Sequence, residues 1–239
     1  ALGIDGSILI MLSSGGLAAL PTARAFPIRL LESGPAAGAL AASAYGASSG
    51  IRDLMAFDMG GTTAKLCLIE DGEPHIANDF EVDRQYRFKK GSGLPIKTPV
   101  VELIEIGAGG GSLARVDSLG LLKVGPESAG AEPGPACYGR GGTQPTVTDA
   151  DLLLGYLDAD YFLGGQMALD REAAERAVAT IAEPLGITRN AAAWGIHQLA
   201  NESMANAARI HAIERGRDPR ALPLFAFGGA GPEIGRAHV

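Results

Sequence analysis

Cysteine and aromatic side chains are scarce in this chain of 239 residues, which has two cysteines and 5% Phe, Trp and Tyr. Cys67 and Cys137 lie far apart and match no zinc or disulfide spacing, so we expect two reduced thiols in a cytoplasmic protein. The histidines show no metal-binding spacing either; they are His75, His197, His211 and His238. These absences exclude a disulfide framework and a zinc motif.

Long apolar runs and an excess of positive charge are also missing. The apolar run at Ile8–Leu12 is far too short to span a bilayer, and the N-terminus lacks a basic region with a cleavage site. The formal net charge is −7, the pI is about 5.1, and no basic stripe is visible. We therefore expect no membrane and no nucleic-acid partner. With 46% hydrophobic residues, the chain can bury the core of one large or two small domains.

A Walker A sequence is absent, but another glycine loop stands between two apolar runs. Residues 56–69 read as a strand, a turn and a second strand, and the turn holds Asp58, Gly60, Gly61, Thr62 and Thr63. Glycine lets a backbone approach an anion closely, and the amides and threonine hydroxyls are donors to phosphate oxygens. The Asp58 carboxylate is suited to holding hydrated Mg²⁺ beside a polyphosphate. The motif therefore predicts a phosphate loop.

A second glycine turn follows the apolar run Leu222–Phe227. It contains Gly228, Gly229 and Gly231, and Pro232 comes next. A strand that ends in glycines before a helix places backbone amides against a nucleotide. Many αβ turns look like this, but together with the Asp58 loop the turn predicts a grip on a nucleotide from two sides.

Glycine and proline dominate residues 91–142. We expect a strand at 100–106, a hairpin at 113–124 with its turn at 117–120, and no continuous helix or strand through 125–142. This block either lines a site or simply connects elements. The turn between the strand at 100–106 and the hairpin comprises Gly109, Gly110, Gly111 and Ser112. It either holds substrate or a partner subunit, or it is a tight structural turn.

Helices are expected in much of the rest, and Pro27–Leu31 is a possible strand. One helix begins at Ser33–Pro35 and runs to Ala47, and three more occupy 150–157, 170–182 and 190–215. We expect Thr148 to be the N-cap of the first of these three, and Pro184 to stop the second.

Several polar residues leave two interpretations open. Asp149 and Asp151 are candidates for an acid or base pair, or serve as caps and dipole partners of their helix. Cys137 is a candidate nucleophile or a buried free cysteine. We expect Asn201 and Glu202 to be solvated or to lie at the edge of a cleft.

The order of these motifs resembles the C-terminal half of the actin, heat-shock chaperone and sugar-kinase ATPase superfamily. Within it, the chain resembles the hydantoinase A and 5-oxoprolinase family over nearly its whole length, and the Gly/Pro-rich block is specific to that family. The segments that carry the resemblance are Ser33–Ala37, Phe57–Thr63, Ile106–Asp117, Val124–Gly139, Thr146–Asp151, Arg215–Gly216, Asp218–Arg220 and Phe227–Pro232.

The resemblance implies an α/β fold, namely a ribonuclease H-like, actin-type ATPase half-domain with a mixed sheet, flanking helices and a Gly/Pro-rich insertion at 91–145. Residues 1–50 would end a preceding half-domain and 51–239 would form the second ATPase domain. It also implies an ATP- and Mg²⁺-dependent hydrolase that opens a cyclic amide such as hydantoin or 5-oxoproline, working with a hydantoinase B-like subunit or domain. The Asp58 loop would then meet the phosphates and the Gly228 turn the nucleoside.

Two departures from the family pattern leave alternatives open. Nothing before Asp58 resembles the family's earlier glycine loop, so we expect this chain to be part of a longer protein with half of the nucleotide cleft elsewhere. Lys65 stands where many relatives have an acidic residue, either as a cation near phosphate or as an exposed strand residue. The alternatives for function are an acetone carboxylase-type subunit and a nucleotide-binding fragment without turnover.

Overall fold

The computed structural model describes residues 5–82 and 91–231, so the expectations for Pro232 and His238 fall outside the described residues. The chain forms two compact units that do not follow chain order. Unit 1 comprises residues 1–56, 67–104 and 222–225, and unit 2 comprises 57–66, 105–221 and 226–239. The division at residue 50, which the resemblance implies, stays a prediction.

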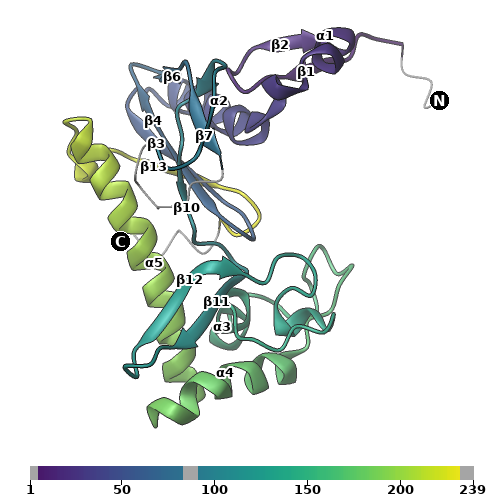
Figure 1. Cartoon of the computed structure of the whole chain (residues 1–239), viewed down its shortest axis with the longest axis vertical. Helices are drawn as coiled ribbons and strands as arrows, with labels where there is room; N and C mark the ends of the chain where they lie inside the picture. Colours follow the sequence, from purple (N-terminus) through teal and green to yellow (C-terminus); the bar gives the residue numbers. More distant parts are fainter. Residues whose placement is uncertain (1–4, 83–90, 232–239) are drawn as a thin grey trace. The chain divides into compact units, whose positions relative to one another are not determined.

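A five-stranded sheet contains the two apolar runs around the predicted phosphate loop (Figure 1). Its order is β10-β4-β3-β13, with β5 paired to β4. The strands are β3 (Leu54–Met59), β4 (Ala64–Glu70), β5 (Glu73–Pro74), β10 (Ile104–Ile106) and β13 (Leu224–Phe227). Both β3 and β4 are buried almost throughout, which explains why they read as continuous apolar runs instead of alternating ones.

Unit 1 contains a small N-terminal substructure before the sheet. An antiparallel hairpin of β1 (Leu9–Met11) and β2 (Leu17–Ala19) leads into α1 (Leu20–Ala25) and α2 (Ser33–Ser48). The possible strand at Pro27–Leu31 is wrong, because Pro27–Leu30 is a 3₁₀ helix whose first position suits the fixed φ of proline. Two further antiparallel pairs join β6 (Ile76–Ala77) to β9 (Val100–Val101) and β7 (Phe80–Val82) to β8 (Leu94–Ile96).

Unit 2 is built on the predicted hairpin and three helices. The strands β11 (Ser112–Val116) and β12 (Leu122–Ser128) pair antiparallel, and β12 packs against the long helix α5 (Figure 1). β12 continues through Pro126, since it has a pairing partner on one side only and proline is tolerated at such an edge. A 3₁₀ turn (Ala136–Tyr138) then precedes the helices α3 (Val147–Leu154), α4 (Arg171–Leu185) and α5 (Arg189–Glu214).

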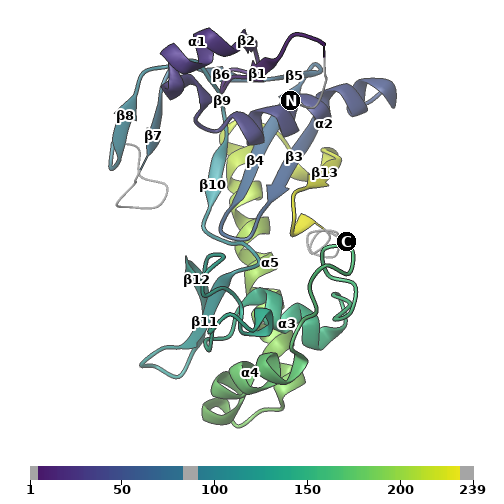
Figure 2. The same cartoon turned by 90° about the vertical axis from the view of Figure 1, so that its right-hand side faces the viewer.

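The core of unit 2 lies where α3, α4 and α5 meet (Figure 2). Small residues face one another here, including Ala150, Ala174, Ala193 and Ala200, so the helix backbones approach closely. Two expected helix boundaries are wrong. Thr146, and not Thr148, caps α3. The helix α4 continues through Pro184 to Leu185, and Gly186 is its C-cap in the left-handed conformation.

The fold is a mixed α/β arrangement with helices flanking the sheet, as expected. None of the helices in the described part of the chain combines the length and apolar character that a membrane crossing requires.

Candidate functional site

Three glycine segments from distant parts of the sequence meet at the predicted phosphate loop, all within unit 2. The amides of Gly110 and Gly111 donate to the carbonyl oxygens of Gly60 and Gly61 over 3.2 and 2.6 Å. On another side, the amide of Ala230 donates to the carbonyl oxygen of Met59 over 2.9 Å. The structure therefore brings the Asp58–Thr63 loop together with both other glycine turns.

The contacts of these turns explain their glycines. A Cβ on Gly109 would come within 2.8 Å of the carbonyl oxygen of Gly60, and one on Gly111 within 2.9 Å of that of Gly61. Gly228 has φ +96°, and a Cβ there would overlap the Asp58 carboxylate. Side chains at these positions would separate the three backbones.

The predicted phosphate loop exposes hydrogen-bond donors, while its carbonyl oxygens accept hydrogen bonds from the neighbouring glycine turns. Gly61 and Thr62 are exposed, and Thr63 is half-buried. Within residues 5–82 and 91–231, the amides of Gly61 and Thr62 and the hydroxyls of both threonines have no hydrogen-bond partner. Free donors on one side and bonded acceptors on the other give the loop a positively polarised face, as an anion-binding loop requires.

Asp58 lies at the end of β3, at the base of this loop, and is half-buried. Burial raises the pKa of the Asp58 carboxyl, and the positive charge of Lys65 partly offsets that increase. In the described part of the chain, no group of three His, Cys, Asp or Glu side chains is placed to hold a metal ion. A single half-buried carboxylate beside exposed amide and hydroxyl donors is the kind of group that binds Mg²⁺ together with water and nucleotide phosphates.

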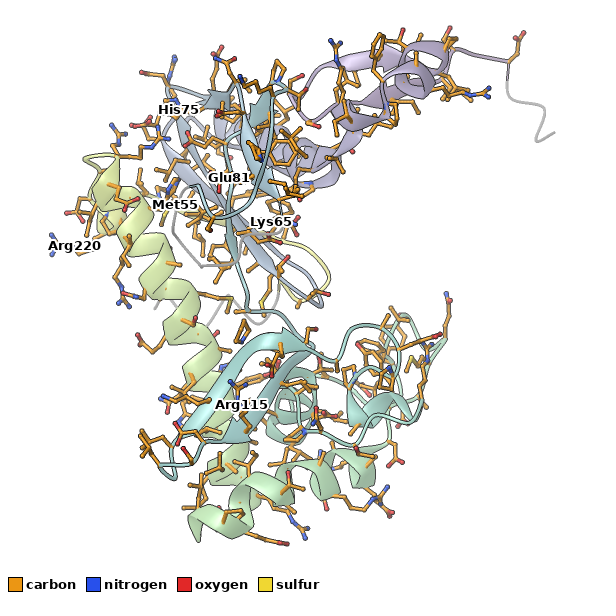
Figure 3. All side chains as sticks on the ribbon, viewed as in Figure 1. Met55, Lys65, His75, Glu81, Arg115 and Arg220 are labelled. Carbon is orange, nitrogen blue, oxygen red and sulfur yellow. The ribbon has the colours of Figure 1, made fainter. Side chains whose placement is uncertain are left out.

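Lys65 is less exposed than the sequence indicated. Its side chain, on β4 (Figure 3), is 18% exposed, and its ammonium lies 3.7 Å from the carboxylate of Glu105 on the neighbouring β10. The expectation of an exposed strand residue is thus wrong. Lys65 instead supplies a positive charge close enough to Asp58 to act on its pKa.

The candidates Gly109, Gly110, Gly111 and Ser112 are all buried. Ser112 closes the turn, because its hydroxyl accepts the amide of Gly109 and its own amide donates to the carbonyl of Gly109, each over 2.9 Å. These contacts are those of a tight structural turn behind the phosphate loop. A role in lining substrate stays a prediction.

Asp149 is fully buried and serves as an acceptor for the Gly/Pro-rich block. Its carboxylate accepts the amides of Ala136, Cys137 and Thr146 over 3.2, 2.8 and 2.9 Å, and the Thr146 hydroxyl over 2.8 Å. The carboxylate thus caps α3 and also fixes the Pro135–Cys137 turn. Cys137 is buried, and burial with the negative charge of Asp149 raises the pKa of its thiol, which opposes the nucleophile interpretation.

The Asp151 carboxylate contacts a histidine side chain on α5. Its carboxylate lies 2.9 Å from Nδ1 of His197, and Nε2 of His197 lies 2.8 Å from the side-chain nitrogen of Asn201. All three side chains are buried, so the expectation that Asn201 is solvated or at a cleft edge is wrong, whereas Glu202 is exposed. The only sequence signal for this cluster is the helical spacing of His197 and Asn201 on the face that carries Ala193 and Ala200.

Thr148 is the residue whose role the sequence did not indicate. Its amide and its hydroxyl both donate to the carbonyl oxygen of Gly110, over 2.7 and 2.8 Å. It therefore joins the first turn of α3 to the glycine turn that supports the phosphate loop.

The fold and these glycine loops define an α/β chain with a candidate phosphate-binding site. The family model for hydantoinase/oxoprolinase matches residues 2–238, and the chain belongs to this family. This confirms the family resemblance stated from the sequence.

The most informative similarities are to ATP-dependent and related enzymes. The chain is 44% identical to the caprolactamase subunit alpha of Pseudomonas jessenii over 91% of this chain and 30% of that protein. It is 33% identical to 5-oxoprolinase from Dictyostelium discoideum over 95% of this chain and 19% of that protein.

Two solved structures share the fold. The nucleotide-free structure of acetone carboxylase superposes with a TM-score of 0.83 at 31% identity, covering 97% of this chain and 31% of that one. The ATP-dependent caprolactamase from Pseudomonas jessenii superposes with a TM-score of 0.78 at 40% identity, covering 99% and 33%. The chain spans about a third of the length of the first curated relatives it matches.

Proposed function

We propose that this chain supplies one wall of an ATP site in an ATP-dependent enzyme that opens a five-membered cyclic amide, such as a hydantoin or 5-oxoproline. The observation that carries the proposal lies in the Gly61–Thr63 segment beside the Asp58 carboxylate: within the residues that the structure describes, the amides of Gly61 and Thr62 and both threonine hydroxyls have no hydrogen-bond partner. The relatives named caprolactamase and 5-oxoprolinase support a cyclic amide as the substrate, and of the two only 5-oxoprolinase supports a five-membered ring.

In this proposal each residue of the loop has one task. The amides of Gly61 and Thr62 and the threonine hydroxyls donate to phosphate oxygens, and Asp58 holds Mg²⁺ through water. The backbone of the Gly228, Gly229 and Gly231 turn faces the nucleoside. ATP would supply the phosphoryl group that converts the amide oxygen into a leaving group, so that water can open the ring.

Asp149 and Asp151 have different tasks from those of an acid and base pair. Asp149 is saturated with backbone and hydroxyl donors, and Asp151 binds the His197 ring. We propose that both hold protein segments in place. The catalytic base and a hydantoinase B-like partner then lie outside the chain, in keeping with relatives that are named as subunits.

A second candidate is an acetone carboxylase-type subunit. The observation that favours it is the TM-score of 0.83 with the nucleotide-free acetone carboxylase structure. The same phosphate loop would serve there, with a ketone oxygen as the atom that is activated. We place either enzyme in the cytoplasm because both cysteines are free thiols.

Isothermal titration calorimetry with Mg-ATP tests the nucleotide site. We expect the protein that carries this chain together with the other side of the proposed cleft to bind Mg-ATP. Asp58→Asn and Thr63→Ala should weaken binding at least about tenfold, and omission of Mg²⁺ should abolish the difference between Asp58→Asn and the unchanged protein. Asp5→Asn, which removes an exposed carboxylate elsewhere, is the matched control. Absence of any Mg-ATP binding would refute the proposal.

A second experiment separates the two enzyme classes. The rate of ATP hydrolysis by the chain together with its subunit partner is measured with hydantoin, 5-oxoproline or caprolactam, and with acetone plus bicarbonate. Stimulation by a cyclic amide alone supports the first candidate, and stimulation by acetone with bicarbonate alone supports the second.

A further inference from the structure

Both ring nitrogens of His197 make hydrogen bonds in the interior of unit 2. Its side chain is 3% exposed, and the partners are Asp151 on α3 at Nδ1 and Asn201, one turn along α5, at Nε2. Two aromatic rings cover it: Trp194 stacks at a centroid distance of 5.5 Å and Tyr156 lies at 4.9 Å. A polar group at this depth is costly unless it is hydrogen-bonded, so the cluster is a specific feature of the fold.

The partners define which nitrogen carries hydrogen. An ionised Asp151 carboxylate can only accept, so Nδ1 of His197 is the donor in that contact. The side-chain nitrogen of Asn201 can only donate, so Nε2 accepts. Because Nε2 accepts a hydrogen bond from Asn201 and the ring is buried, substrate does not reach His197. The residue therefore does not act as a general base in this arrangement.

The Asp151–His197–Asn201 cluster fixes the position of α3, a helix that is too short to be stable alone. α3 has eight residues, and isolated helices of this length are not stable in water, so its position depends on contacts with α4 and α5. The Asp151–His197 pair is the charge-assisted hydrogen bond between α3 and α5.

The first turn of α3, one turn before Asp151, contacts the glycine turn that supports the predicted phosphate loop. Thr148 holds the carbonyl oxygen of Gly110 with two donors, and the amide of Gly110 donates to the carbonyl oxygen of Gly60. A continuous series of hydrogen bonds, with one turn of α3 in its middle, thus joins His197 to Gly60. All of its members belong to unit 2.

We propose that His197 is a positioning residue for nucleotide binding: through Asp151, α3 and Thr148 it fixes the Gly110 turn, and thereby the Gly60–Thr63 loop. This rests on the proposed nucleotide function. The essential contact is the Nδ1–H hydrogen bond to Asp151, while the contact at Nε2 orients the ring.

A matched pair of substitutions tests which nitrogen matters. His197→Asn places an amide N–H near the position of Nδ1 and keeps a donor to Asp151, whereas His197→Gln places its amide near Nε2 and loses that donor. We expect Mg-ATP affinity to fall at least about tenfold in His197→Gln and to stay within about threefold in His197→Asn, the difference that one charge-assisted hydrogen bond makes. His211→Gln, another buried histidine of α5, controls for loss of an imidazole.

Hydrogen exchange of the same variants without nucleotide reports on the link itself. We expect the amides of Gly110, Gly111 and Thr148 to exchange faster in His197→Gln, with His197→Asn and His211→Gln close to the unchanged chain. Equal effects of His197→Asn and His197→Gln on exchange would overturn the proposal, because loss of ring volume alone would then account for them.

The experiments distinguish failure of the proposed nucleotide site from failure of the link between His197 and the glycine turn. If the unchanged protein with both sides of the proposed cleft binds no Mg-ATP, the proposed function fails, and the exchange pattern still decides whether His197 fixes the glycine turn. If His197→Gln does not fold, Thr148→Val removes the hydroxyl contact with Gly110 in the first turn of α3. Unchanged exchange of Gly110 and Gly111 in that variant would refute the link.

Discussion

The backbone of Gly228 lies directly against the carboxylate of Asp58, so that a Cβ at residue 228 would overlap Asp58 Oδ1. The two residues are 170 positions apart in the sequence, yet each closes one side of the same candidate site. Only a residue without a side chain leaves the carboxylate in place while the turn at 228–231 approaches the phosphate loop.

Gly228→Ala is expected to disturb this contact. Its φ of +96° is unfavourable for alanine, and the methyl group would displace Asp58 or the carbonyl of Met59. We expect a loss of about 2–3 kcal/mol in the free energy of unfolding and weaker Mg-ATP binding. Urea denaturation and calorimetry measure the two effects. Gly6→Ala, outside the candidate site and with nothing within 4 Å of the added Cβ, should change both quantities little.

The pH dependence of Mg-ATP binding should follow the Asp58 carboxyl. Burial raises its pKa and Lys65 lowers it, so binding should weaken as the pH falls through that raised pKa and the carboxylate is protonated. Lys65→Met removes the opposing charge, and we expect the loss of binding to move to higher pH. The ¹³C shift of the Asp58 carboxyl and calorimetry at several pH values test this; a lower midpoint in Lys65→Met would contradict it.

The same pKa shift has a consequence for stability without nucleotide. The folded-state pKa of Asp58 is raised, so protonation of Asp58 favours the folded chain. Its contribution to the free energy of unfolding is present below the unfolded pKa, about 3.9, and is lost as the pH rises through the folded value. Asp58→Asn should abolish this part of the pH profile of urea denaturation.

Neither thiol should react in the folded chain at neutral pH. Burial raises the pKa of Cys67 to about 12, and burial together with Asp149 raises that of Cys137. Because the folded pKa values are raised, stability should fall as the pH rises above the unfolded thiol value of about 8.5. Thiol titration with and without denaturant tests this: two thiols should appear only on unfolding, and fast modification of Cys137 in the folded chain would contradict its burial.

Asp149→Asn is expected to destabilise unit 2. The asparagine keeps one acceptor oxygen. Its NH₂ group, however, would face either the Cys137 amide or the Thr146 hydroxyl, both of which donate to the carboxylate in the unchanged chain. We expect a loss of about 3 kcal/mol in the free energy of unfolding. Asp158→Asn is the control, because Asp158 is exposed and accepts one backbone amide. A loss equal to that of the control would show that the buried contacts contribute little.

Much of the fold was predictable because local patterns agree with it. The apolar runs around Asp58 form β3 and β4, the hairpin with its turn at 117–120 forms β11 and β12, and the helix expected at 190–215 is α5 at Arg189–Glu214. One error occurred where two local signals compete. Thr148 looks like an N-cap, but Thr146 takes that role through a reciprocal pair with Asp149, which leaves Thr148 free to bind Gly110.

The candidate site was predictable only in part. Its three glycine segments carry sequence signals, although the turns at 109–112 and 228–231 also resemble ordinary structural turns. The Asp151–His197–Asn201 cluster has almost none, because a histidine and an asparagine one turn apart are common on solvated helices, and only the packing of α3 against α5 buries them.

The sequence by itself determined the family and the α/β class, and it predicted the phosphate loop, because glycines, hydroxyls and a carboxylate at fixed short spacing define a local backbone shape. Only the tertiary structure decided that the turns at 109–112 and 228–231 support that loop from two sides, that Lys65 lies against Glu105, and that Asp149 and Asp151 bind protein groups. Those relationships join residues tens to hundreds of positions apart, and their energies depend on burial, which no local pattern contains.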